Sequence, residues 1–393
     1  MSDSTILTYT EIDREAWSRL VQTSRTGTWF QSPEAYELFA SLPEMFTPFA
    51  FGVVSKPESD SGLINKETLR GVCVGYVTKE KSRLRQFFTR RAIILGGPCL
   101  AEDATDEEVT ALLSALNAQL STLNSQPSTL NQPPLLRRGR GMSLNTPIYI
   151  EIRNFNDYSR WRGAIEAAGF AYQPHLNFHV DCTDKQMMWE WLSDNRKRQI
   201  KRGMPNPSPS LMGRDVSEQD VREWYGILQE LYRTKVKTPL LPVEFFVQAY
   251  KQGVGQFLLI RHEGKIIGGS MVVKKPTTDT PPGPLSEGRE NADENAIGNG
   301  VVYEWYECGM NAAYKEQYPS VMATWAGMQY AHEQGCARYD MMGAGVPGVP
   351  YGVRDFKSEF GGKLVEHGRW LYVAKPWLYA IGKAGVRKLK GES

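Results

Sequence analysis

The chain has 393 residues, of which 41% are apolar and 11% aromatic, and its formal net charge is +2 at pH 7. This length exceeds the usual size of one domain and the apolar content is ample for packed cores, so we expect two domains of comparable size and exclude a disordered chain. The small net charge excludes the global positive field that coating a nucleic acid requires. Anions must therefore be bound by local clusters of cations.

Cysteine and histidine usage excludes the common structural cross-links. The cysteines are scattered, odd in number and never spaced as Cys-x-x-Cys: Cys73, Cys99, Cys182, Cys308 and Cys336. This pattern predicts reduced, mostly buried thiols and no disulfide framework, and the five histidines show no metal spacing. The polar N-terminus does not resemble a signal peptide, and no apolar run approaches the ~20 residues of a membrane span. We expect a cytoplasmic protein with no metal site.

The first half of the chain mixes short helical and strand patterns. Amphipathic periodicity predicts helices at 12–22, 33–42, 106–120 and 158–168. Alternation and β-branched content predict strands at 48–54, 68–78, 91–95, 148–152 and 176–181.

The second half of the chain also mixes helical and strand patterns. Helices are predicted at 184–202, 217–235, 243–252 and 319–335, and strands at 255–261, 264–274, 299–306 and 337–342. Because strict βαβ alternation is absent, we expect α+β domains with mixed sheets. We place the boundary between domains at 1–182 and 183–393.

Two segments read as insertions. Residues 121–142 contain a near-duplicate Ser-Thr-Leu-Asn, and residues 276–298 are rich in Pro, Gly, Asp, Glu and Asn. Neither shows an apolar period, so we expect mobile loops that bury too little surface to offset their ordering entropy.

The most informative segment is 351–366. It places Arg354, Asp355, Lys357 and Glu359 on one short stretch that is closed by two glycines and followed by an apolar run. A charged helical turn ending in glycines can present a cation and a carboxylate at a cleft. A solvated helix with a glycine cap explains the same pattern.

A second cluster concentrates five cations within seven residues, at Arg196, Lys197, Arg198, Lys201 and Arg202. Adjacent cations repel each other, and guanidinium groups suit phosphates, so an anionic ligand is one interpretation. A solvated helix face that pairs with nearby acids is the other.

Several of these motifs resemble the FemABX-type transferases, which add amino acids to peptidoglycan precursors and are built from GNAT-like acyltransferase domains. Phe-Lys-x-x-Phe-Gly at 356–361, followed by Val-Glu at 365–366, is similar to the C-terminal signature of that family. Residues 28–33 resemble its early aromatic-Gln-Ser segment, and 339–345 its Tyr-Asp-x-x-Gly segment. The resemblance implies two tandem GNAT-like domains with mixed β-sheets flanked by helices.

The resemblance also implies roles for individual residues. Lys357 would stabilise an oxyanion or a terminal phosphate of the donor, and Glu366 would orient Lys357 or a substrate amine. Asp103 is matched to a family aspartate that is a candidate base, and a helix-entry acid is its alternative role. The expected substrate-binding residues are Trp29, Gln31, Arg196, Lys197, Arg198, Tyr351, Arg354 and Phe356. Arg196, Lys197 and Arg198 each remain open as the match to the family arginine that holds a diphosphate.

The donor and acceptor follow from the same resemblance. The Arg/Gln-x-x-Gly-x-Gly/Ala loop that cradles the pyrophosphate of coenzyme A is absent from 319–328. We therefore favour aminoacyl-tRNA over acyl-coenzyme A as donor, expect no tightly bound cofactor, and expect a nucleotide-linked or lipid-linked peptidoglycan precursor as acceptor. The predicted function is transfer of an aminoacyl or acyl group to an amine. A coenzyme A-dependent N-acyltransferase acting on another small-molecule or polysaccharide amine and a non-catalytic ligand-binding protein are the alternatives.

The C-terminal segment 376–390 would be an amphipathic helix with Leu378, Ile381 and Leu389 on one side and several cations. Such a helix can lie on an anionic membrane as a peripheral contact. Docking of its apolar side on the second domain is the alternative.

Overall fold

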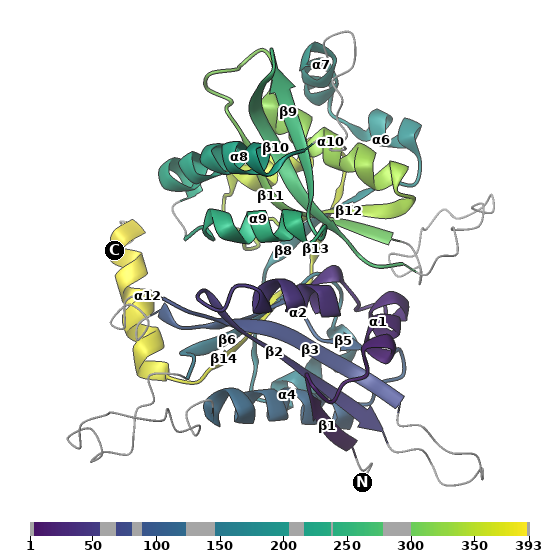
Figure 1. The fold of residues 1–393 in the computed structure, drawn as a ribbon, viewed down its shortest axis with the longest axis vertical. Coiled ribbons are helices and arrows are strands. Elements are labelled where there is room, and N and C mark those ends of the chain that lie inside the picture. Colours follow the sequence, from purple (N-terminus) through teal and green to yellow (C-terminus); the bar gives the residue numbers. More distant parts are fainter. Residues whose placement is uncertain are drawn as a thin grey trace. The chain divides into compact units, whose positions relative to one another are not determined.

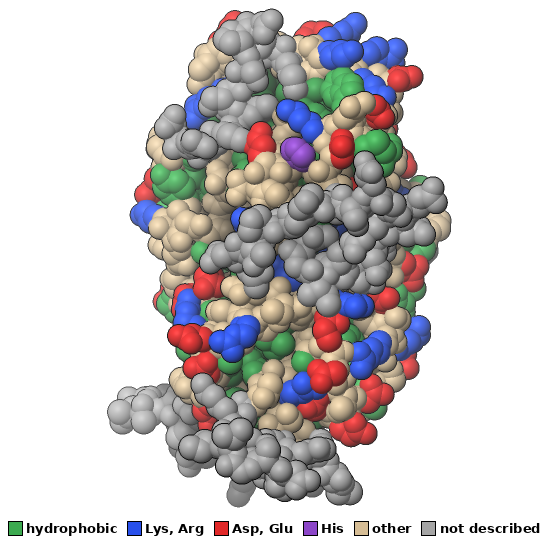
Figure 2. Space-filling model, turned by 90° about the vertical axis from the view of Figure 1, so that its right-hand side faces the viewer, with side chains coloured by type: hydrophobic (Ala, Val, Ile, Leu, Met, Phe, Trp, Pro, Cys, Tyr) green, Lys and Arg blue, Asp and Glu red, His purple; other side chains and the backbone are tan. Residues whose placement is uncertain are grey.

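The computed structural model describes residues 4–55, 68–80, 89–122, 146–203, 216–236, 239–277 and 300–390, without the side chains of 385–390. Apart from their first two residues, the insertions expected at 121–142 and 276–298 lie outside the described residues. The chain divides into two compact units (Figure 1), Met1–Gln173 with Gly368–Ser393, and Pro174–His367. On the face drawn in Figure 2, basic and acidic side chains are interspersed over much of the described surface.

The first unit is built on a sheet in the order β1-β2-β3-β4-β6-β14-β7, with β5 paired to β3. All pairs formed by its described strands are antiparallel except β4 with β6. Its elements are β1 Ser4–Thr8, α1 Arg14–Thr23, η1 Trp29–Gln31, α2 Pro33–Ala40, β2 Phe46–Ser55, β3 Thr68–Thr78, β4 Ala92–Gly96, β5 Cys99–Leu100, α4 Asp106–Thr122, β6 Tyr149–Asn154, η3 Ser159–Trp161, α5 Arg162–Ala167, β7 Ala171–Gln173, β14 Arg369–Val373 and α12 Pro376–Lys390.

The second unit is built on a sheet in the order β13-β8-β12-β11-β10-β9, in which only β11 and β12 are parallel among the described pairs. Its elements are β8 Leu176–Asp181, α6 Lys185–Trp191, α7 Asp194–Gly203, α8 Glu218–Leu231, η4 Tyr232–Val236, α9 Val243–Lys251, β9 Gln256–His262, β10 Lys265–Lys274, β11 Gly300–Gly309, α10 Pro319–Glu333, β12 Cys336–Gly343, α11 Gly352–Ser358 and β13 Lys363–Glu366.

Each unit thus contains one parallel pair joined by a helical crossover, β4-α4-β6 in the first and β11-α10-β12 in the second. Parallel neighbours need such a crossover because a tight turn cannot join them. Figure 1 shows α4 along one face of the first sheet, where Leu112 and Leu116 pack with Ile152. Helix α10 is buried on nearly all sides, since it lies between the second sheet and α7, and its sequence is accordingly apolar around its circumference.

The expected α+β class with two mixed sheets flanked by helices is confirmed. The chain divides differently from the single boundary expected between 182 and 183, however. Strand β8 pairs with β12 and β13, and its Phe178 and Val180 enter the core of the second unit. Strand β14 returns to the first sheet between β6 and β7, where Trp370 joins the core.

The single helix expected at 184–202 is two helices. It breaks at Leu192, whose ψ of 142° is extended, and α7 then begins at Asp194. The break is stabilised from outside the segment, because the Ser193 amide donates to the Glu359 carbonyl at 2.9 Å. A contact 166 residues away in sequence has no signature within the helical pattern.

Candidate active site

The candidate site lies where β11 and β12 cease to pair. Gly300–Tyr303 of β11 are in register with Cys336–Asp340 of β12, and the ladder between them ends there. Both strands continue, β11 to Gly309 and β12 to Gly343. Backbone groups beyond this point need other partners, because a buried carbonyl or amide without one is costly.

A bulge on each strand accompanies this opening. On β11, Tyr306 faces Met271 and Glu304 faces Val272, so Trp305 is an extra residue. On β12, the register to β8 shifts by one residue between Asp340 and Gly343. Bulges bend a strand and increase its twist, which explains why two parallel neighbours separate here.

The β12 bulge is held by its own side chain. Met342 has a φ of 58°, a left-handed conformation that is unfavourable for a residue with a side chain. Asp340 Oδ1 accepts a hydrogen bond from the Met342 amide at 2.7 Å and so stabilises this turn of the backbone. On the same strand face, His179 Nε2 lies 3.3 Å from Asp340 Oδ2.

The β11 bulge determines which side chains meet. In a regular strand, residues three apart point to opposite faces, but the extra residue places Glu304 and Glu307 on the same face. Trp305 and Tyr306 point the other way, toward α9, with ring centroids 5.2 Å from Phe245 and 4.9 Å from Phe246.

Glu304 and Glu307 face α10. Tyr339 donates its hydroxyl to Glu304 Oε2 at 2.6 Å, and the Tyr339 ring lies against Gly327 of α10. Ser320, at the start of α10, hydrogen-bonds with the Glu307 carboxylate. Ser270 stands opposite Glu307 on β10, and Ser270 Oγ and Glu307 Oε1 are buried without a hydrogen-bond partner among the described residues.

Lys357 of α11 enters the opening and is only 7% exposed. Its ammonium donates to the Gly343 carbonyl at 2.8 Å and to the Met341 carbonyl. Arg354 continues this arrangement, since its guanidinium donates to the Ala344 carbonyl at 2.8 Å and the Val346 carbonyl at 2.6 Å. Side chains of α11 thus satisfy carbonyls at and beyond the end of β12.

Buried charge dominates the electrostatics of this site. Burial lowers the pKa of Lys357, while the charges of Glu304, Asp340 and Glu307 oppose that shift. Burial raises the pKa of Glu304, against the charge of Lys357. Burial, and then the charge of Glu304, raise the pKa of Glu307 to about 8. Glu307 therefore tends to retain its proton near neutral pH, while the charge of Lys357 favours the ionised form of Glu304.

The expected phosphate anchors separate into different environments. Arg196 is buried, stacks 4.5 Å over the Phe356 ring and donates to the Phe356 carbonyl at 3.3 Å, so the structure brings these two predicted residues together. Burial lowers the pKa of Arg196. Lys197 donates to the Glu190 carbonyl at 2.9 Å, while Arg198 is exposed. Arg196 therefore clamps α7 onto α11, and its role in ligand binding stays a prediction.

Tyr351 and Glu366 are both exposed, in contrast to Lys357. Tyr351 is 42% exposed at the start of α11 and packs beside Gly345. Glu366 was expected to orient Lys357 or a substrate amine, and it lies exposed at the end of the edge strand β13, opposite Leu176. Two carbonyls of β12 accept from the Lys357 ammonium, and the role of Glu366 stays a prediction.

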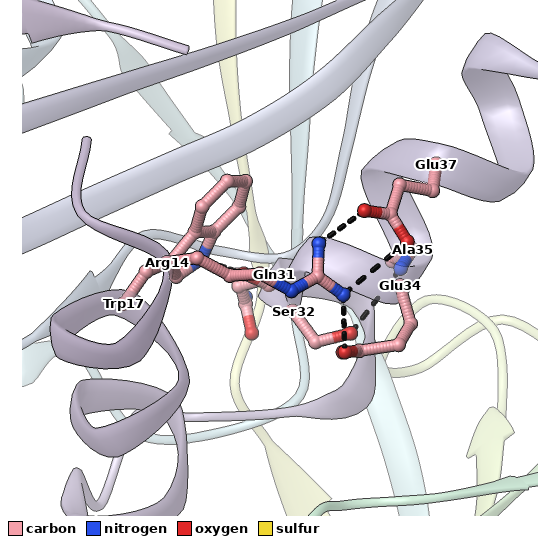
Figure 3. Close-up of polar contacts among 7 residues, drawn as sticks. All are labelled: Arg14, Trp17, Gln31, Ser32, Glu34, Ala35 and Glu37. Atoms are coloured by element: carbon pink, nitrogen blue, oxygen red, sulfur yellow. Dashed lines mark hydrogen bonds and ion pairs between the residues drawn. The ribbon is translucent and has the colours of Figure 1, made fainter. Parts of the chain in front are cut away.

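The residues predicted in the first unit have structural contacts. Gln31 is fully buried: its side-chain amide donates to the Leu95 and Gly97 carbonyls, and its backbone carbonyl accepts from Trp17 Nε1 at 2.6 Å (Figure 3). Trp29 is also buried and meets Phe30 edge-to-face. Gln31 thus fixes the turn after β4, and a substrate contact for either residue stays a prediction.

The segment after Gln31 forms the N-terminus of helix α2. Ser32 accepts a hydrogen bond from the Ala35 amide at 3.2 Å and caps α2, while Arg14 of α1 pairs with Glu34 at 3.0 Å and with Glu37 (Figure 3). These contacts join α1 to α2 and explain the Gln-Ser-Pro-Glu sequence without a ligand.

Asp103 precedes α4 on the surface. Its carboxylate lies 2.9 Å from Arg70, and the hydrogen bond from Arg70 lowers the pKa of Asp103. A lower pKa makes the carboxylate a weaker proton acceptor. These contacts fit the alternative of a helix-entry acid, and catalysis by Asp103 stays a prediction.

A separate pocket of about 380 Å³ opens in the second unit. It is lined by Arg202, Gly203, Ile260, Arg261, His262, Ile267, Glu316 and Gln317. Arg261 is already paired with Asp220 at 2.6 Å, so the pocket has mixed charge. Among the described residues, no group of His, Cys, Asp and Glu has the geometry to hold a metal ion. No described helix is long and apolar enough to cross a membrane.

Comparison with known proteins identifies a family model and solved structures that this chain resembles. Residues 297–384 match the FemAB family. The crystal structure of FemX aligns with a TM-score of 0.60 and 11% sequence identity over 96% of this chain and 99% of that one. The C-terminal domain of a putative lysylphosphatidylglycerol synthetase from Agrobacterium fabrum gives 0.46 at 12% identity over 95% of both chains. L-PGS from Bacillus licheniformis gives 0.44 at 12% identity over 97% of both chains. No curated protein sequence matches the chain.

We predict that Gly327→Ala destabilises the protein by about 1–3 kcal/mol, because its added methyl group would collide with the Tyr339 ring and overpack α10. Gly226→Ala on α8 is the matched control. Its methyl group meets no described heavy atom within 4 Å and should stabilise the helix by about 0.5–1 kcal/mol. Urea unfolding measures both, and equal effects of the two variants would contradict the packing described here.

Arg196→Ala should cost about 2–4 kcal/mol, since it removes a buried guanidinium and its contacts with Phe356. Arg198→Ala, two residues along the same helix and exposed, should change stability by less than about 0.5 kcal/mol. Thermal unfolding of the two variants checks the difference. If Arg196→Ala is as stable as the parent, Arg196 is not the clamp inferred above.

Glu307 should make stability depend on pH. Its folded pKa of about 8 lies above the ordinary glutamate value of 4.5, so the folded state binds more protons between these values and the free energy of unfolding falls as pH rises through this window. Glu307→Gln removes the effect, so the variant should gain stability relative to the parent from pH 6 to 8.5. Glu333→Gln, exposed near the end of α10, is the control and should follow the parent.

Proposed function

We propose that the chain transfers an aminoacyl or acyl group to an amine of a peptidoglycan precursor, because residues 297–384 match the FemAB family and the fold is similar to that of FemX. The observation that carries the proposal is Lys357 in the opening between β11 and β12, where its charge acts on the buried Glu304 and the half-buried Glu307. Acyl transfer to an amine needs a proton acceptor and a positive charge, and these side chains supply both.

The proton acceptor is the Glu304/Glu307 pair. An alkyl ammonium has a pKa of roughly 10.4 and must lose its proton before its nitrogen can attack a carbonyl carbon. A base whose pKa lies near the working pH contributes on the order of 10²–10⁴ in rate. Glu307, with its raised pKa and an unpaired Oε1, fits this role better than Asp103.

The positive charge is Lys357. An ammonium has three N–H groups, and two of them donate to the Met341 and Gly343 carbonyls among the described residues. The third remains for the oxygen that becomes negative when the amine attacks, and such stabilisation contributes roughly 10²–10³ in rate. The new C–N bond forms and the ester or thioester bond breaks. Of the two protons that the ammonium nitrogen loses, the carboxyl pair passes one to the leaving group and the other is released to solvent.

The first residues of α10 help to distinguish between the two candidate donors. Pro319 has no amide hydrogen, and the Ser320 amide already donates to Asn311 Oδ1 at 3.2 Å. The first two residues of α10 therefore offer no free amide to a pyrophosphate. Together with the absence of the glycine loop from 319–328, this favours aminoacyl-tRNA over acyl-coenzyme A as donor. A nucleotide-linked or lipid-linked muropeptide is the proposed acceptor.

The test is a transfer assay with purified protein, aminoacyl-tRNA or acyl-coenzyme A as donor, and a UDP-linked muropeptide as acceptor. Lys357→Met should lower turnover by at least about 100-fold. Lys315→Met, an exposed lysine of the same unit, should retain parental turnover. Near-UV circular dichroism establishes that both variants are folded.

The outcomes separate the alternatives. Parental turnover in folded Lys357→Met would reject the catalytic role of this lysine. Turnover with acyl-coenzyme A alone would identify a coenzyme A-dependent N-acyltransferase. Binding of the muropeptide without turnover with either donor would identify a ligand-binding protein on the same scaffold.

A further inference from the structure

The beginning of α10 is held by a residue outside the helix. Tyr318 precedes the helix in a left-handed conformation, with a φ of 48°, and its side chain makes no capping hydrogen bond. Asn311, which follows the end of β11, supplies the cap: its Oδ1 accepts from the Ser320 amide at 3.2 Å and its Nδ2 donates to Ser320 Oγ at 2.8 Å. One asparagine therefore fixes both the backbone and the side chain of Ser320.

A glycine lets Ser320 lie against the sheet. A Cβ atom at Gly309, the last residue of β11, would lie 2.6 Å from Ser320 N and 2.7 Å from Ser320 Oγ. A side chain does not fit at such distances, so this close approach requires glycine. Ser320 is consequently buried and its hydroxyl reaches the carboxyl group of Glu307, near the end of the same strand.

The hydrogen bond from Asn311 determines where the Ser320 hydroxyl points. A serine hydroxyl has one hydrogen to donate and two lone pairs that accept. Because Ser320 Oγ accepts from Asn311, its own hydrogen is available for the Glu307 carboxylate. Glu307 Oε1 has no hydrogen-bond partner among the described residues, so the other oxygen accepts from Ser320. Ser320 thus holds one oxygen of Glu307 and leaves Oε1 available.

The groups around Glu307 act on its charge in opposite directions. Burial, and then the charge of Glu304 on the same strand, raise the pKa of Glu307. The hydrogen bond from Ser320 and the charge of Lys357 on α11 lower it, while Ser270, opposite on β10, is uncharged. A donor to a carboxylate favours its ionised form, which is the form that can accept a proton.

We propose that Ser320 is a positioning residue for the transfer reaction: held by Asn311, it orients the Glu307 carboxylate so that Oε1 takes the proton of the attacking amine. This inference rests on the function proposed above, in which the Glu304/Glu307 pair is the proton acceptor. It adds that a residue acting through Glu307 determines the pH above which transfer becomes fast.

The first measurement is the pH dependence of kcat/KM for transfer. Loss of a hydrogen bond to a carboxylate raises the pKa of that carboxylate, so Ser320→Ala should move the acid limb of the profile upward by about 1–2 pH units. Asn311→Asp should move it in the same direction, because the second oxygen replaces the Nδ2 donor and competes for the Ser320 hydrogen. Thr234→Ala, which removes an exposed hydroxyl of the same unit, should follow the parent.

The second measurement, urea unfolding from pH 6 to 10, needs no substrate. The folded pKa of Glu307 is about 8, so the free energy of unfolding of the parent should fall as pH rises to about this value. Ser320→Ala raises the folded pKa and should extend the fall by about 1–2 pH units. In a Glu307→Gln background, Ser320→Ala should leave the pH dependence unaltered, because the titrating group is gone.

The outcomes distinguish this inference from the proposed function. Absence of transfer by the parent would reject the proposed function, and with it the role of Ser320 in transfer. Transfer with a parental pH profile in folded Ser320→Ala would overturn the positioning role alone, and so would an extended stability profile that persists in the Glu307→Gln background. Thermal unfolding verifies that each variant is folded, and Asn311→Asp decides if Ser320→Ala is not.

Discussion

The second unit depends on one buried ammonium placed where a parallel pair of strands opens. A ladder that ends inside a protein leaves carbonyls that need donors, and Lys357 supplies them from a helix that is not part of the sheet. The same charge compensates the buried carboxylate of Glu304, whose burial without a cation would be strongly unfavourable. A single side chain therefore donates hydrogen bonds to carbonyls at the end of the ladder and compensates negative charge nearby.

The neighbouring elements have shapes that fit this arrangement. The β11 bulge turns Glu307 to the side of Glu304, and the β12 bulge is stabilised by Asp340. Gly327 lets α10 approach closely enough for the Tyr339 hydroxyl to reach Glu304. Arg354 and Arg196 fix α11 from its two ends, one through carbonyls after β12 and the other through Phe356. The site is thus held by elements from across the unit.

The sequence was sufficient for the α+β class and most of the elements, because periodicity and glycine positions are local signals. It could not reveal that Glu304 and Glu307 share a face, since a separation of three predicts opposite faces and a bulge has no clear signature. Nor could it reveal that the Lys357 ammonium donates to carbonyls of β12, because this contact depends on where the ladder between β11 and β12 ends. Gln31 and Trp29 followed the family pattern, yet their contacts are internal to the first unit.

Strand β14 has a consequence for how the molecule is made. It sits between β6 and β7 in the first sheet, although the ribosome delivers it about two hundred residues after them. The second unit can reach its native contacts as soon as residue 367 has emerged, whereas β7 has no neighbour in the first sheet until β14 arrives. The second unit, which is nested within the first, can therefore fold while the first unit still lacks β14. This sequence of events reverses the usual amino-to-carboxyl order in which domains fold during synthesis.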